Sequence, residues 1–355
     1  MNVIFLQTYP IYHEGLSEEQ WLSLENRDKW MPALTVSLGY PCELWAVGKK
    51  SSVHTYRWND DISVTIRLFP ADSLSGRTKK HTSRELVRYA GDQEIGHLFL
   101  KGTDGGAGLQ ILKDLLIPRT IPWSFVVGGE YHSRFNSAAS SVLCETRNQL
   151  TFLRNPTWFR KQFSRSTINP NAFILPKSVD TEHFCPNQTV SKEWDVITAG
   201  RLMDYYKDYS ALKELSGSLR VAVLGGGAAE EALRKQMPDI EWLGQVPNHQ
   251  IPEYLVKARS FFHTSLNDHF PRVIPEAAAC GVPVIAFGQS IASDVLPADI
   301  GLRISRKKRA SDEILKLLDD DAKLLEMGKK ARNFAEQRWH KHSSLPLLKK
   351  VLGAY

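Results

Sequence analysis

The sequence has few cysteines and no long apolar segment. Its four cysteines lie far apart and form no C-x-x-C pair, which argues against a disulfide framework or a zinc site: Cys42, Cys144, Cys185 and Cys280. No stretch approaches the roughly 18 unbroken apolar residues that a membrane-spanning helix needs. The first residues, MNVIFLQTYPIYHEG, have neither a basic region nor a long apolar core, so we expect no signal peptide. Together these absences predict a cytoplasmic protein with free thiols.

The sequence also has little excess charge of either sign. The 45 Lys and Arg residues exceed the 39 Asp and Glu residues, so the 355-residue chain has a net charge of +6. This permits an anionic partner, but no recognised nucleic-acid module is present and we expect no nucleic-acid partner. Basic residues gather in two runs, 147–165 and 303–309. They predict either peripheral contact with an anionic membrane at its inner face or a solvated basic surface.

Strand-like and helix-like apolar patterns alternate along the chain. In the first half we expect buried strands at 3–7, 42–47, 97–100, 123–127 and 172–175. After the polar stretch 186–193 the alternation restarts, with strands expected at 195–199, 220–224, 241–243, 260–263 and 282–286. Alternation of this kind predicts parallel sheets with helices on both faces. We therefore expect an α/β fold of two Rossmann-like domains that face each other across a ligand-binding cleft.

The most informative stretch runs from Asn267 to Ala286. It predicts a loop, a helix that starts near Pro271 and stops at Gly281, and then a buried strand. Glu276 lies in this otherwise apolar helix, where an ionised carboxylate is costly unless something binds it. Asp268 lies in the preceding loop, near the free backbone amides of a helix start. The pair suits a ligand that carries hydroxyls and phosphates, and helix capping with a structural ion pair is the alternative.

This stretch resembles the carboxylate-x7-carboxylate signature of the retaining glycosyltransferases of family 4, which have the GT-B fold. The family pattern is Glu-x-Phe-(Gly/Pro)-x4-Glu-Ala-x-Ala-x-Gly-x-Pro-Val. The chain matches it in register, with aspartate for the first glutamate, at Asp268, Phe270, Pro271, Glu276, Ala277, Ala279, Gly281, Pro283 and Val284. Segments 174–186, 199–207 and 223–247 are similar to further family motifs. Before residue 174 only the alternation of elements matches.

The resemblance implies how the two domains divide the work. Residues 1–187 would form an acceptor-binding domain, completed by a terminal helix at 338–355 that crosses back to it. Residues 188–337 would bind the nucleotide-sugar donor. The implied reaction moves a sugar, with retained configuration, from a nucleoside-diphosphate sugar to a hydroxyl of a glycan, lipid-linked or small-molecule acceptor, as in polysaccharide biosynthesis.

The resemblance also implies roles for individual residues. Glu276 would hold the ribose hydroxyls and Asp268 the hydroxyls of the donor sugar, and these two are the candidate catalytic residues. Four more residues would add contacts to the sugar or nucleotide: Gly227, Phe270, Arg272 and Val273. Glu130 or His132, which follow the strand at 123–127, could replace a histidine that relatives carry near the donor sugar. A loop without any such role is the alternative for both.

Transfer from a nucleotide sugar builds negative charge on the departing diphosphate. No Asp-x-Asp metal motif stands at a suitable strand end, so we expect no metal and no cofactor beyond the nucleotide sugar itself. Arg201 and Lys207 follow a strand end and are the predicted diphosphate partners. Two other functions stay open: a GT-B-fold nucleotide-sugar epimerase or phosphorylase, and a non-catalytic subunit that binds sugar nucleotides.

Overall fold

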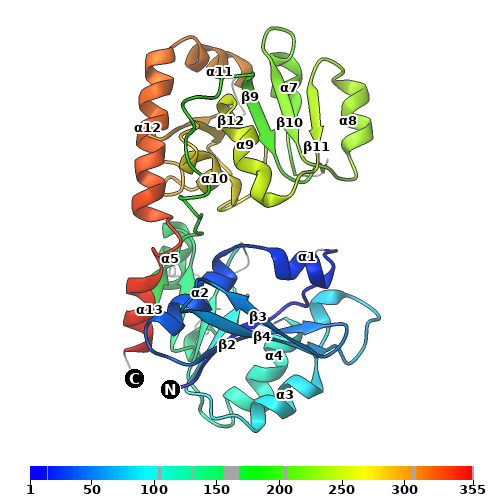
Figure 1. Cartoon of the computed structure of the whole chain (residues 1–355), viewed down its shortest axis with the longest axis vertical. Helices are drawn as coiled ribbons and strands as arrows, with labels where there is room; N and C mark the ends of the chain where they lie inside the picture. Colours follow the sequence, from blue (N-terminus) through cyan, green and yellow to red (C-terminus); the bar gives the residue numbers. More distant parts are fainter. Residues whose placement is uncertain are drawn as a thin grey trace. The chain divides into compact units, whose positions relative to one another are not determined.

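The computed structural model describes residues 1–13, 15–102, 105–129, 132–154, 168–203, 206–305 and 309–353. These residues form two compact units, Met1–Pro176 with Ser344–Tyr355 and Lys177–Ser343 (Figure 1). Each unit is built on a mainly or wholly parallel sheet with helices packed on it. The predicted α/β class with two Rossmann-like domains is therefore confirmed.

The first unit contains an eight-stranded sheet in the order β3-β4-β2-β1-β5-β6-β7-β8. Neighbouring strands are parallel, except that β3 runs antiparallel to β4. Successive residues of β1 enter opposite cores, with Ile4 and Leu6 on one side of the sheet and Val3 and Phe5 on the other. The strands are β1 (Val3–Gln7), β2 (Cys42–Gly48), β3 (Ser52–Arg57), β4 (Ser63–Pro70), β5 (His97–Lys101), β6 (Trp123–Val126), β7 (Ser141–Cys144) and β8 (Ala172–Ile174).

Helices cover both faces of this sheet. Side-chain caps define several of their starts, since Ser17, Asn26 and Ser83 each accept a hydrogen bond from a backbone N–H of the first turn. The α-helices are α1 (Glu18–Ser23), α2 (Arg27–Ser37), α3 (Arg84–Gly91), α4 (Gly106–Ile111), α5 (Arg147–Arg154) and α13 (Leu345–Leu352). The shorter turns are η1 (Thr78–Lys80), η2 (Leu112–Leu116) and η3 (Asn136–Ala138).

The last helix returns to the first unit, as predicted. Helix α13 packs against α2, and its Leu348 and Val351 enter the same core as Trp30 and Met31. Its two lysines of the last turn stay at the surface. The return of the chain end is therefore driven by burial of an apolar helix face.

The second unit contains a six-stranded parallel sheet in the order β11-β10-β9-β12-β13-β14. Its strands are β9 (Trp194–Ala199), β10 (Val221–Leu224), β11 (Glu241–Gly244), β12 (Ala258–His263), β13 (Val284–Phe287) and β14 (Gly301–Ile304). Its helices are α7 (Ser210–Leu215), α8 (Glu230–Gln236), η5 (Asn248–Gln250), α9 (Ile251–Leu255), α10 (Val273–Ala279), α11 (Ala310–Leu318) and α12 (Asp321–Arg338). The order reverses between β9 and β12, and ligands of doubly wound sheets bind at the carboxyl ends of the strands at such a point.

The structure places residues 177–187 and 338–343 in the second unit, whereas the sequence pattern assigned them to the first. Contacts with the end of α12 explain this placement. The backbone N–H of Val179 donates to the carbonyl of Trp339 at 2.7 Å. The Arg332 guanidinium on α12 donates to the carbonyls of Thr181 and Phe184, each at 2.8 Å. The polar stretch 186–193 therefore lies inside the second unit.

Four strands lie outside the predicted ones: β3, β4, β7 and β14. Strand β3 mixes polar and apolar residues because it is an edge strand with one exposed face. Strands β7 and β14 have only four residues each, which weakens their periodic signal, whereas β4 alternates polar and apolar residues and its signal was missed. These four segments are identified as strands by their pairing with neighbouring strands, several of which are distant in the sequence.

No helix in the described ranges is both long enough and apolar enough to cross a membrane. Two described members of the basic runs, Arg154 and Arg303, donate to backbone carbonyls of the protein. Arg154 donates to the carbonyl of Ala172, at 3.0 Å from its Nε, and Arg303 donates to the carbonyl of Ile291 at 3.0 Å. Several other members of the runs lie outside the described residues: Arg160, Lys161, Arg165, Arg306, Lys307 and Lys308. Membrane contact stays a prediction.

Candidate functional site

The predicted site residues of the second unit gather where its sheet reverses order. One loop, 200–208, follows β9 and carries Arg201 and Lys207, and the other, 264–272, follows β12 and carries Asp268. Backbone hydrogen bonds join the two loops. The N–H of Asp208 donates to the carbonyl of Thr264 at 2.9 Å, and the N–H of Leu266 donates to the carbonyl of Tyr206 at 2.8 Å. Lys207 and Asp268 are thus brought together from positions far apart in the sequence.

Glycines seat the Arg201 loop on the loop that follows β10. A Cβ on Gly225 would lie 2.2 Å from the carbonyl oxygen of Gly200, and one on Gly227 would lie 2.4 Å from that of Leu202. Both glycines also have positive φ, +133° and +156°. Gly227, predicted as a nucleotide-binding residue, therefore has a packing reason to be glycine: the two loops approach backbone to backbone.

Lys207 is the most strongly perturbed cation of this site. Burial lowers its pKa to about 8; Asp268 raises the pKa and Arg201 lowers it further. Its Nζ lies beside the Gly200 backbone, 3.3 Å from where a Cβ of that residue would stand. Arg201 itself is exposed. Burial has removed part of the water shell of Lys207 beside a second cation, a state that an anionic ligand would stabilise.

The sequence patterns missed His263, which ends β12. Its side chain is 6% exposed, and its Nε2 lies 3.7 Å from Oδ2 of Asp268. That nitrogen has no hydrogen-bond partner among the described residues. Burial lowers the pKa of His263 to about 3, and the nearby Lys207 and Lys177 lower it as well, so the imidazole is neutral. The available signal was a polar residue ending an apolar strand of the predicted sheet.

Glu276 lies on α10 and is 5% exposed. Its Oε1 accepts a hydrogen bond from Nδ2 of Asn248 at 3.3 Å. Burial raises the pKa of Glu276, and the positive charges of Arg272 and Lys177 oppose that rise together with the Asn248 bond. The carboxylate therefore has one weak protein hydrogen bond and two cations near it, and it retains capacity to accept from ligand hydroxyls.

Of the residues around the start of α10, some pack in the core and others are accessible to a ligand. The Phe270 ring is 2% exposed and packs against Trp339, with ring centroids 5.7 Å apart, so only its backbone is left for a ligand. Its carbonyl accepts a hydrogen bond from the ammonium of Lys177. Arg272 is exposed and Val273 half-buried. The sequence patterns missed Lys177 as a site residue, although it stands in a segment that resembles a family motif.

The first unit holds the two remaining predicted residues. His132 packs edge-on against Phe152, with ring centroids 4.5 Å apart. Glu130 lies outside the described residues. Their predicted role near the donor sugar stays a prediction.

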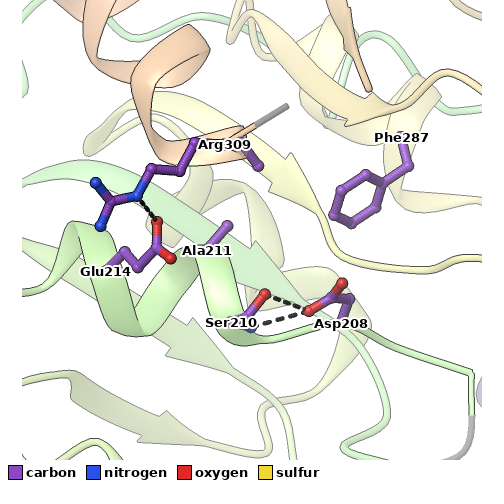
Figure 2. A pocket seen from close by; sticks show the side chains of 7 residues that line it. Asp208, Ser210, Ala211, Glu214, Phe287 and Arg309 are labelled. Carbon is purple, nitrogen blue, oxygen red and sulfur yellow. Dashed lines mark hydrogen bonds and ion pairs between the residues drawn. The ribbon is translucent and has the colours of Figure 1, made fainter. Parts of the chain in front are cut away.

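A pocket of about 120 Å³ lies beside the site in the second unit (Figure 2). Its polar side chains already bind one another. The Asp208 carboxylate accepts from the N–H and hydroxyl of Ser210, at 3.1 and 2.6 Å, and Glu214 pairs with Arg309 at 3.4 Å. None of the predicted site residues lines it. Within the described ranges, no group of three or more His, Cys, Asp or Glu side chains has a metal-binding arrangement.

Residues 179–334 match the family model described as glycosyl transferases group 1. A curated relative from Arabidopsis thaliana, which is one of the subunits of phosphatidylinositol N-acetylglucosaminyltransferase, is 31% identical over 153 residues, which cover 38% of this chain and 34% of the relative. Sucrose-phosphate synthase from Thermosynechococcus elongatus has a similar structure, with a TM-score of 0.73 at 14% identity over 100% of both chains. The Anabaena protein HepE, solved in complex with UDP, has a TM-score of 0.68 at 12% identity over 100% of both chains.

These likenesses define the class of protein. The chain has the GT-B fold, and residues 179–334 of its second unit match the model of glycosyl transferases group 1. The matches to the first curated relatives span only about a third of their length, 34%, 33% and 32%. They therefore support the class of the second unit more directly than the activity of the whole chain.

Proposed function

We propose that this protein transfers a sugar from a nucleoside-diphosphate sugar to an acceptor hydroxyl, and that its second unit binds the donor. The observation that carries the proposal is that Lys207 lies near Arg201 and Asp268, while Lys177 lies near both His263 and Glu276, in a unit with the group 1 family match. The UDP complex of the structurally similar HepE supports a nucleotide-sugar donor.

In this proposal the cations of the β9 loop stabilise the leaving diphosphate. Negative charge grows on that group as the glycosidic bond breaks, and cations fixed in advance lower the energy of that state. Lys207 is half-buried next to Arg201, so part of its hydration is already lost. The diphosphate would supply the interactions that water no longer makes with this ammonium group. The proposal needs no metal ion, because the two side chains supply the positive charge.

The carboxylates orient the donor. Glu276 accepts hydrogen bonds from the ribose hydroxyls and Asp268 from the sugar hydroxyls. Neutral His263 lies beside that carboxylate, with its Nε2 3.7 Å from Oδ2 of Asp268. The proposal includes retention of the anomeric configuration, which the Asp268-to-Glu276 signature supports. The acceptor is a hydroxyl of a glycan, a lipid-linked molecule or a small molecule, and the phosphatidylinositol in the name of the Arabidopsis relative supports the lipid-linked class.

The test is a panel of nucleotide sugars, including UDP- and GDP-linked ones, incubated with the protein and a set of acceptor alcohols. We expect transfer that persists in EDTA and is lost in Glu276→Ala, with the matched surface variant Glu253→Ala unaffected. Donor consumed without any acceptor alcohol would favour an epimerase, and donor binding without turnover across the panel would favour a non-catalytic subunit. Full transfer by Glu276→Ala would overturn the assignment of the site.

A further inference from the structure

His263 ends strand β12 at the carboxyl edge of the second sheet, and the proposed function gives its side chain no task. The imidazole is buried, and within the described ranges its Nε2 makes no hydrogen bond. Such a nitrogen is costly, because folding has removed it from water and has returned no bond. The carboxylate of Asp268 offers an acceptor nearby, since its Oδ2 lies 3.7 Å from this nitrogen.

The alternation of side chains along β12 decides which way the ring points. Phe261 belongs to the same core as Ile274 of α10, whereas Phe262 belongs to the core on the opposite face of the sheet. Successive strand residues point to opposite faces, so His263 shares the face of Phe261. The imidazole therefore lies on the side of the sheet that α10 covers, and α10 also carries Glu276.

The loop between His263 and Asp268 is held at successive residues. A backbone hydrogen bond ties Thr264 to the β9 loop, and the carbonyl of Ser265 accepts from the hydroxyl of Ser290 at 2.9 Å. The two ends of the loop therefore keep their places. The Asp268 side chain is 36% exposed, so a ligand reaches it from outside while the imidazole faces it from inside.

Burial and two lysines keep the imidazole neutral. Burial lowers the pKa of His263 to about 3, and the charges of Lys207 and Lys177 lower it as well. A neutral ring carries one proton, and a lone pair at Nε2 would face the negative oxygen of Asp268. The tautomer with the proton at Nε2 is therefore favoured. Such a ring donates one hydrogen bond and leaves the carboxylate its negative charge.

We infer that His263 is a positioning residue for the donor sugar: its Nε2–H donates to Asp268 when the nucleotide sugar binds and fixes that carboxylate against the sugar hydroxyls. The inference rests on the proposed function, because it assigns a further residue to the same donor site. Hydrogen bonds of active sites are often long in unliganded structures and shorten in the complex. Here the shortening also satisfies a buried donor, so it adds to the free energy of sugar binding.

Loss of this hydrogen bond should affect the two parts of the donor differently. In the proposed function Lys207 contacts the diphosphate and Glu276 contacts the ribose, and neither contact runs through Asp268. Removal of the His263 nitrogens should therefore leave the affinity for a free nucleoside diphosphate unchanged. The affinity for the nucleotide sugar should fall.

Calorimetric titration of the full chain measures this difference. The probes are UDP-glucose, UDP-N-acetylglucosamine and GDP-mannose, each compared with its nucleoside diphosphate, and the tightest-binding nucleotide sugar is used for the variants. The sugar increment is the dissociation constant of the diphosphate divided by that of the nucleotide sugar. His263→Phe keeps a flat ring without nitrogens and should lower the increment about tenfold.

Two matched variants show whether the nitrogen is responsible. His263→Gln returns an amide N–H near the position of Nε2 and should restore most of the increment. Ser260→Ala removes a buried hydroxyl of the same strand, which donates to the carbonyl of Asp195, and should leave the increment unchanged. No recovery in His263→Gln, or an equal loss in Ser260→Ala, would overturn the inference.

A double-mutant cycle shows whether His263 acts through Asp268. Asp268→Ala should lower the increment by itself, and His263→Phe added to it should lower the increment by less than about twofold more. A further tenfold loss in the double variant would overturn the inference, because the imidazole would then act without the carboxylate.

Binding of the diphosphate keeps this inference apart from the proposed function. An unchanged increment in His263→Phe overturns the inference and leaves the donor site standing. Equal losses of diphosphate and nucleotide-sugar affinity in His263→Phe and in the smaller His263→Leu would also overturn it, because a disturbed fold would explain them. If diphosphate binding is insensitive to Glu276→Gln, the donor site falls instead, and if no nucleotide sugar binds, both fall.

Discussion

Replacement of Glu276 by glutamine should make the protein more stable and a poorer donor binder at the same time. The side chain is 5% exposed, and its hydrogen bond to Asn248 is long at 3.3 Å. Burial raises the pKa of Glu276 from its ordinary value of 4.5, which means that the folded state disfavours the ionised form. Glutamine keeps the shape and an acceptor for Asn248 without the buried charge. The cost of that charge then disappears.

The sign of the pH dependence follows from that raised pKa. Above pH 4.5 the folded state binds more protons at this site than the unfolded state, so the contribution of Glu276 to stability falls as pH rises through the raised pKa. Glu276→Gln lacks this decline. Its melting temperature should therefore exceed that of the parent by more at pH 7 than at pH 4.5, as measured by calorimetry across that range.

The functional loss should be large by comparison. A hydrogen bond from a hydroxyl to a carboxylate contributes about 1.5–3 kcal/mol, so loss of one such bond should weaken donor binding roughly 10- to 150-fold. Titration with the nucleotide sugar measures this, and Glu253→Gln on the exposed face of α9 is the matched control. A variant that melts earlier and binds the donor normally would refute the reasoning, because Glu276 would then be a structural partner of Asn248 and Arg272.

Three further outcomes follow from the same unit. Because burial lowers the pKa of Lys207 to about 8, donor affinity should weaken as pH rises through 8, and a Lys207→Met variant titrated with donor from pH 7 to 9 should show no such step. Because His263 has a pKa of about 3 in the fold and an ordinary value of 6.5, its contribution to stability is lost as pH falls below 6.5. His263→Leu should flatten the melting temperature between pH 6.5 and 4, and an unchanged slope would contradict the neutral, buried imidazole. Gly225→Ala should lower the free energy of unfolding by about 1–3 kcal/mol in denaturant unfolding, because its Cβ would lie 2.2 Å from the Gly200 carbonyl oxygen. The control Gly217→Ala, whose Cβ would lie 3.8 Å from its nearest neighbour, should leave the stability nearly unchanged.

Much of the second unit could be predicted from the sequence because its signals are local. The loop-helix-strand pattern from Asn267 to Ala286 places a proline near the start of α10 and Gly281 just past its end, and the structure has that helix at Val273–Ala279. Spacing along one segment therefore identified both Asp268 and Glu276 as candidates. Arg201 and Lys207 were found in the same way, from their place after a buried strand.

The first unit shows why local signals run out. Its edge strand β3 mixes polar and apolar residues without regular alternation, and only its pairing with β4 identifies it as part of the sheet. The Tyr12 hydroxyl lies 2.7 Å from Nδ1 of His81, and no sequence motif links their two segments. Loop residues from distant segments come together because of the order of the strands in the sheet. That order depends on pairing between strands that are far apart in the sequence.

The sequence alone determined the α/β class, the parallel alternation and the residue types of the proposed donor site, since these depend on periodicity and short spacing. Only the tertiary structure decided that the chain passes between its units at Pro176 rather than near residue 187, because backbone bonds to Trp339 and Arg332 hold residues 179–184 to α12. It also decided that His263 faces Asp268 and that Phe270 is a core residue. Burial and facing partners are properties of packed elements, and no spacing within one segment encodes them.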